Sequence, residues 1–106
     1  MRILDFIISG QKIECDPMCD FSGIASCSRG YLYARFRFSA DWRGTKKVVV
    51  FSCRGVDYPT PLFGGMCEIP AGALVGNTVS VSVVGQRERT RITTNKASFQ
   101  QSSGRA

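Results

Sequence analysis

The chain contains no histidine, and this absence removes more candidate functions than any other feature of its composition. Without an imidazole there is no Ser-His or Cys-His nucleophile pair, and most catalytic metal sites lose their usual ligand. Long apolar runs are also missing: nothing approaches roughly eighteen consecutive apolar residues, so we expect no membrane insertion. The opening segment MRILDFIISG is interrupted by Asp5 and lacks a small-residue cleavage pattern, so we interpret it as a first strand and not as a signal peptide.

Other catalytic patterns are missing as well. The Asp and Glu residues stand apart from one another in the sequence, which argues against an acid–base carboxylate pair and against a calcium loop. The segment Phe63–Gly64–Gly65 is not followed by the Lys and Ser or Thr of a phosphate-binding loop. We therefore expect a protein that is not an enzyme and that has no cofactor.

The five cysteines do not form a convincing metal or disulfide pattern. Cys15 and Cys19 have a spacing that zinc permits, but a second close pair is missing, and Cys53 and Cys67 fall in expected strands. An odd number of cysteines, in a chain for which we expect no signal peptide, fits a reducing compartment. We therefore expect reduced thiols without metal.

A chain of 106 residues with 43% hydrophobic and 21% charged residues is typical of one soluble globular domain. Residues 1–99 are expected to form it, and the polar segment QQSSGRA at residues 100–106 is expected to be a flexible tail. The net charge of +6 raises the question of a nucleic acid or an acidic protein as partner.

Alternating apolar and polar residues predict short strands throughout. In YLYARFRF, residues 31–38, the apolar side chains point one way and the tyrosines and arginines the other, which indicates a half-buried strand. Turn residues separate such segments every eight to twelve residues, a spacing typical of an antiparallel sandwich. The other expected strands are residues 2–9, Lys12–Cys15, an irregular one within 19–29, Lys46–Cys53 as a central strand, Val56–Thr60 as an edge, Met66–Ile69, Thr78–Val84, Arg89–Thr93 and Lys96–Phe99, with one helical turn at Pro70–Leu74.

Two sets of exposed side chains are candidates for an interface. Arginine interleaved with aromatic residues suits a protein interface and also single-stranded nucleic acid. A plain solvated strand face is the alternative. The candidates are Tyr31, Tyr33, Arg35 and Arg37 on one strand, and Arg87, Arg89 and Arg91, which alternate and are expected to line one side of a β-ribbon.

The only tryptophan, Trp42, follows the turn Ser39–Ala40–Asp41. We expect it to be a buried structural anchor that packs near Phe36 or Phe38.

Several of these motifs occur in one order that resembles a known family. Phe38, Ser39, Asp41, Trp42 and Gly44 fit the pattern F-S-x-[DE]-W-x-G; Ile69, Pro70 and Leu74 fit I-P-x-x-x-L; and the closing segments read V-x-V-x-G and R-x-T-T-N. Over roughly residues 3–99 the chain resembles the small immunoglobulin-like domains of phage and prophage structural proteins, of the baseplate, tail-fibre or head-decoration type. The resemblance implies an all-β, immunoglobulin-like antiparallel β-sandwich with one short helical turn, and it implies no catalytic residue.

Three functions remain open. The first is a non-enzymatic phage virion structural protein, a decoration, fibre or tail-tip module, which folds in the host cytoplasm, resides in the virion and binds other virion subunits or copies of itself. The second is a small phage-encoded inhibitor of a host defence protein, and the third is a nucleic-acid-binding β module. For the first, docking through sheet faces and exposed strands is expected, and Thr78–Val84 is either a central strand or a docking edge.

Overall fold

The computed structural model describes residues 1–102 and consists of short strands with two 3-10 turns. The helical turn predicted at Pro70–Leu74 is present as η2 (Ala71–Leu74), and the segment before Arg43 forms a second one, η1 (Ala40–Trp42). The strands are β1 (Arg2–Ser9), β2 (Lys12–Cys15), β3 (Leu32–Phe38), β4 (Lys46–Cys53), β5 (Val56–Leu62), β6 (Met66–Glu68), β7 (Thr78–Arg87), β8 (Thr90–Thr93) and β9 (Ala97–Gln100).

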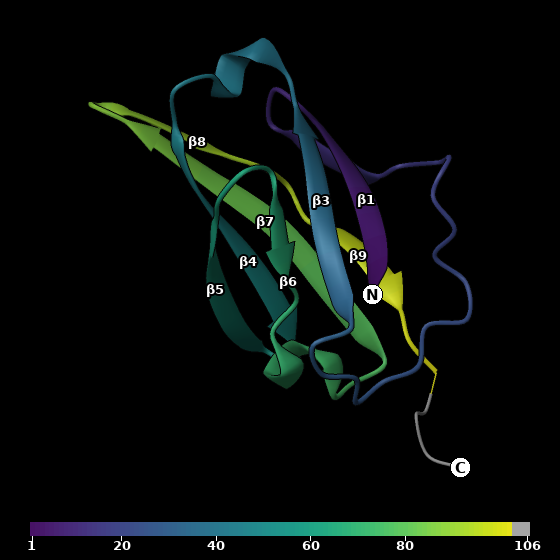
Figure 1. Ribbon diagram of the computed structural model, residues 1–106. Coiled ribbons are helices and arrows are strands. Elements are labelled where there is room, and N and C mark those ends of the chain that lie inside the picture. Colours follow the sequence, from purple (N-terminus) through teal and green to yellow (C-terminus); the bar gives the residue numbers. More distant parts are fainter. Residues whose placement is uncertain (103–106) are drawn as a thin grey trace.

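Two sheets pack face to face, which confirms the predicted all-β sandwich. One sheet has the order β2-β1-β3-β6, and the other has the order β5-β4-β7-β8. In Figure 1 the first sheet lies in front of the second. The short strands β8 and β9 share one side of β7, since β8 pairs with residues 84–87 and β9 pairs with residues 78–81.

One pairing departs from the antiparallel expectation. Strands β1 and β3 run parallel, with Arg2 opposite Leu32 and Ile8 opposite Phe38. A parallel pair needs a connection of a dozen or more residues, and the β2 hairpin together with the following loop provides it. The loop contains no continuous strand within 19–29, because its backbone is held by other groups: the Arg2 guanidinium donates to carbonyl oxygens of the loop, and only Ala25 forms an isolated bridge, with Ser102.

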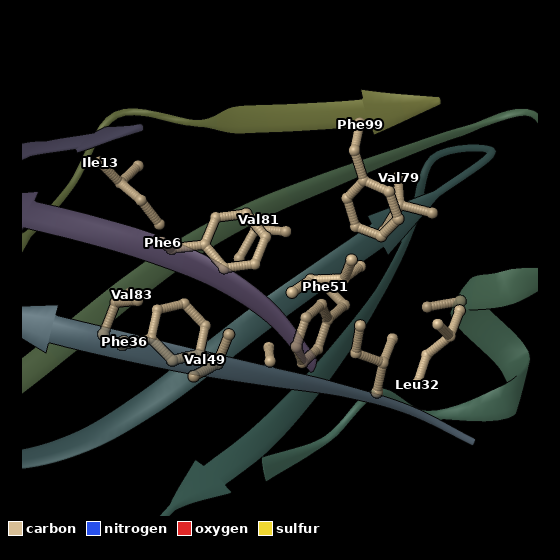
Figure 2. Close-up of a cluster of buried hydrophobic side chains, with 14 of the residues drawn as sticks. Phe6, Ile13, Leu32, Phe36, Val49, Phe51, Val79, Val81, Val83 and Phe99 are labelled. Carbon is tan, nitrogen blue, oxygen red and sulfur yellow. The ribbon is translucent and has the colours of Figure 1, made fainter. Parts of the chain in front are cut away.

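The core lies between the sheets and consists of the alternate residues that the sequence pattern points inward. Figure 2 shows side chains of both sheets meeting there, and the rings of Phe6 and Phe36 stack with centroids 5.2 Å apart. From the second sheet, Val49, Phe51 and Val81 are fully buried against them. Among residues 1–102, no helix is long and apolar enough to cross a membrane.

The predicted boundary of the tail is wrong for residues 100–102. Gln100 is the last residue of β9, and Gln101 is buried, with its backbone N–H donating to the Asn77 carbonyl at 2.6 Å. The backbone N–H of Ser102 donates to the carbonyl of Ile24 at 2.9 Å. Composition alone suggested a tail, but these polar residues satisfy buried backbone groups of two neighbouring segments. The rest of the predicted tail, residues 103–106, lies outside the described residues.

Candidate interaction surfaces

The first predicted surface lies on the outer face of the four-stranded sheet. Tyr33, Arg35 and Arg37 point outward from β3, and Tyr31 precedes the strand with half of its surface exposed. The parallel register places Asp5 of β1 directly opposite Arg35. The two side chains form a bidentate ion pair, with Nε to Oδ1 at 2.6 Å and the second contact, from a terminal nitrogen to Oδ2, at 3.1 Å.

Both arginines of this face are therefore engaged within the chain. The hydrogen bonds that Arg35 donates to Asp5 hold the pKa of Arg35 above its usual value, and Arg37 donates to Oδ2 of Asp16 at 3.0 Å. Carboxylates that already neutralise these two cations reduce the charge available for phosphate groups. Reversing the charge of Arg35 would set two carboxylates against each other across β1 and β3, so this variant would disturb the sheet as well as the surface.

The second predicted surface does not form a single row. Arg87 lies opposite Thr90 and Arg91 lies opposite Gln86, so Arg87 and Arg91 occupy successive pairs, whose side chains point to opposite faces. Arg89 belongs to the turn at the tip of this hairpin, which projects beyond the sandwich at the upper left of Figure 1. Arg87 also donates to the backbone carbonyl of Arg43. The prediction of three arginines on one side is wrong because the ribbon turns at Glu88 and Arg89.

Trp42 is fully buried, as the sequence predicts, and it closes one end of the sandwich. Its indole Nε1 donates to the carbonyl of Gly10 at 2.8 Å, and its ring lies 5.3 Å from that of Phe38. Gly85 of β7 makes room for it, since a Cβ there would lie 2.7 Å from Cζ3 of the indole. The ring of Phe36 lies on the other side of Phe38 in this chain of contacts, with its centroid 6.2 Å from that of Phe38.

A third surface, which the sequence analysis did not single out, is the outer face of the five-stranded sheet. We call it the valine face and define it by four rows of residues that are neighbours across the strands. A basic row is followed by two uncharged rows and then by a row of serines with one aspartate. The rows are Lys46, Gln86 and Arg91; Pro61, Val48, Val84 and Thr93; Pro59, Val50 and Ser82; and Asp57, Ser52, Ser80 and Ser98.

The valine face is hollowed at its basic end. Two hollows, with volumes of about 670 and 520 Å³, share Lys46 and Val48 in their walls. The larger one extends over Pro61 to Phe63, whose side chain is 81% exposed and is among the most exposed large apolar groups of the described chain. Exposed aromatic and aliphatic groups beside a concave surface are typical of protein-binding sites.

A sequence signal for this face does exist in strand β4. Val48, Val49, Val50 and Phe51 put apolar side chains on both faces of the strand, a pattern typical of strands that are covered on both sides. We interpreted this run only as evidence for a central strand, which it is, since β4 lies between β5 and β7. The second consequence, an apolar outer face, was missed.

The edge of the five-stranded sheet at β5 is a poor docking site. Of the two alternatives for Thr78–Val84, the central strand is confirmed, since β7 lies between β4 and β8. Strand β5 is an edge, as predicted, but Pro59 and Pro61 have no backbone N–H to donate. At this edge, contacts through the sheet face therefore fit better than strand addition.

The cysteines are spread over the fold. Within residues 1–102, no three side chains of His, Cys, Asp or Glu come together as a metal site, and Cys19 lies under the edge of β1, where its Sγ accepts the N–H of Asp5 at 3.4 Å. Burial raises the pKa of Cys67 to about 11, and burial also raises the pKa of Cys15. Cys27 is exposed and Cys53 is buried.

These environments predict an order of thiol reactivity. The thiolate is the reactive form, so at pH 8 we expect exposed Cys27 to react with iodoacetamide first and Cys67 to react slowly. Between pH 8 and 10 the rate at Cys67 is expected to rise about tenfold per pH unit, because its pKa lies near 11. The folded protein keeps this proton more tightly than the unfolded chain, whose thiol has a pKa of 9.0, so stability is expected to fall as the pH rises from 9 toward 11.

Mass spectrometry of the labelled peptides measures the order directly. Labelling in denaturant without reductant is expected to reach all five cysteines. Equal rates at Cys27 and Cys67 in the native protein would contradict the burial of Cys67.

Comparisons of the chain with protein-family models, with curated proteins and with solved structures found no match.

Proposed function

We propose that this protein is a non-enzymatic assembly module of a phage particle, which acts through protein–protein contacts made by the valine face. The observation that supports this best is the distribution of charge. A chain with a net charge of +6 carries no charged side chain in the two middle rows of that face, where Val48, Val50 and Val84 are half-buried and Pro59 and Pro61 are exposed.

An uncharged and partly apolar sheet face suits a protein partner better than nucleic acid. Phosphate recognition needs clustered free cations, whereas Arg35 and Arg37 are paired with carboxylates and Arg87 and Arg91 point to opposite faces. Burial of the valine side chains and of Phe63 against another subunit would remove apolar surface from water, which is the main driving force of stable association. The resemblance to phage structural domains gives the proposal its setting.

The experiment is to measure incorporation into purified particles of the parent phage by quantitative mass spectrometry. We expect the chain to be present, and we expect Val84→Arg to reduce its incorporation at least tenfold, because a cation in the middle of the contact remains unpaired. Val75→Arg is the matched control: Val75 is 44% exposed at the end of η2, outside the valine face, and this variant is expected to incorporate normally.

Circular dichroism and thermal melting verify that both variants fold. Absence of the wild-type chain from particles would contradict the proposal. Copurification with one host enzyme instead would support inhibition of a host protein, and binding of single-stranded DNA with a steep salt dependence would support the nucleic-acid alternative.

A further inference from the structure

We propose that the valine face binds a second copy of this chain, with the two faces stacked and their strands antiparallel. The inference rests on the proposed function, since it names the partner of the same surface.

Self-association is difficult for a protein with a net charge of +6, because like charges of the two copies repel each other. A surface that meets its own copy must therefore keep like charges apart. The valine face does so: its middle rows are uncharged, Lys46 and Arg91 lie in the first row, and Asp57 lies in the last row. By contrast, the outer face of the other sheet carries the ion pairs of Arg35 with Asp5 and of Arg37 with Asp16, whose charges would have to be desolvated in a contact.

The positions of these charges select one orientation of the two copies. A two-fold axis that lies in the interface at right angles to the strands places the first row of each copy over the last row of the other. Lys46 of one copy then approaches Asp57 of its partner, and Val48 and Val84 pack against the row of Val50. A two-fold axis along the strands would instead place the basic first row of one copy over the basic first row of the other.

The area of the valine face determines how tight a dimer we expect. Its end rows are six residues apart on β4, from Lys46 to Ser52, which is about 20 Å at 3.4 Å per residue, and four strands are about 20 Å wide with their side chains. Two such faces cover on the order of 1,000 Å² in total, the low end for specific interfaces. We therefore expect a weak, concentration-dependent dimer, with a Kd on the order of 100 μM.

Sedimentation equilibrium over roughly 10 μM to 1 mM tests the proposal. The wild-type chain is expected to change from monomer to dimer over this range, and Val48→Arg is expected to abolish the dimer. The matched control Val75→Arg is expected to dimerise as the wild type does. A wild-type monomer at 1 mM, or an undiminished dimer of Val48→Arg, would overturn the proposal.

A charge exchange tests the orientation. Lys46→Asp and Asp57→Lys are each expected to weaken the dimer about tenfold, and the double variant is expected to recover most of the wild-type affinity. Within one chain these residues stand about 20 Å apart, at opposite ends of the face, so recovery requires a contact between copies. Additive losses in the double variant would overturn the antiparallel arrangement.

Failure of this inference is distinguishable from failure of the proposed function. If the chain stays monomeric at 1 mM but is incorporated into particles through Val84, self-association is refuted and the proposed function still holds. If the chain dimerises but is absent from particles, the proposed function is refuted and self-association still holds.

Discussion

Trp42→Ala is expected to lower the free energy of unfolding by about 3–5 kcal/mol, the typical cost of removing a large buried aromatic side chain. The indole is fully buried, contacts the ring of Phe38 and donates a hydrogen bond to the Gly10 carbonyl. Truncation removes the apolar contacts and also leaves that carbonyl without its donor. Urea denaturation monitored by circular dichroism measures the change in the free energy of unfolding.

Trp42→Phe separates these two contributions. It keeps an aromatic ring in the site but removes the Nε1 donor, so we expect a smaller loss, about 1–3 kcal/mol. An unchanged unfolding midpoint for Trp42→Ala, or tryptophan fluorescence typical of full exposure in the native protein, would show that this residue is not a structural anchor.

Gly85→Ala is expected to destabilise the fold by about 1–3 kcal/mol through overpacking. A Cβ at this position of β7 would lie 2.7 and 2.8 Å from two ring carbons of Trp42 and 3.0 Å from Oγ1 of Thr45. The Trp42 ring is fixed by its hydrogen bond to Gly10, so it cannot withdraw freely. Ordinarily, replacing a strand glycine by alanine would be neutral or favourable, which makes the sign of the change informative.

A double-mutant cycle identifies the cause. In a Trp42→Leu background, which leaves more space beside β7, the added cost of Gly85→Ala is expected to become much smaller. As a control, Ser82→Ala on the outer side of the same strand is expected to have little effect. A cost of Gly85→Ala that is the same in both backgrounds would contradict a direct clash with Trp42.

Most of the sandwich could be predicted from local patterns. The period of two in β3 and β7 fixes which side chains are buried, and Arg54 and Gly55 form the expected tight hairpin, with positive φ angles of 54° and 76°. The prolines of β5 correctly indicated an edge strand. These features depend on short segments, so one sequence is sufficient to infer them.

Long-range pairings could not be predicted in the same way. Nothing in the alternation of residues 31–38 reveals that β3 lies parallel to β1, and therefore nothing reveals that Arg35 meets Asp5. The polar residues Gln101 and Ser102 gave no signal of order, because their hydrogen bonds are to Asn77 and Ile24, far away in the sequence. Such contacts depend on topology and not on local composition.

For the candidate interaction surfaces too, local sequence predicts some features and the topology determines the others. Tyrosines and arginines attracted attention because they are common in interfaces, but the structure engages Arg35 and Arg37 in ion pairs within the chain. The valine face could be inferred in part from the sequence, since β4 carries valines on both sides. Its row of Pro61, Val48, Val84 and Thr93 comes from four different strands, so it emerges only once the register is known.

Methyl-labelled NMR spectra recorded at increasing protein concentration test the central claim, that the valine face is the surface by which this protein binds. Between about 20 μM and 1 mM, the methyl signals of Val48, Val50 and Val84 are expected to shift together along one binding curve. Ile3 and Ile7, on the outer face of the other sheet, are expected to stay in place and serve as the internal control. Shifts at Ile3 and Ile7 with the valine signals unchanged would contradict it, and no concentration dependence at all would contradict self-association through this face.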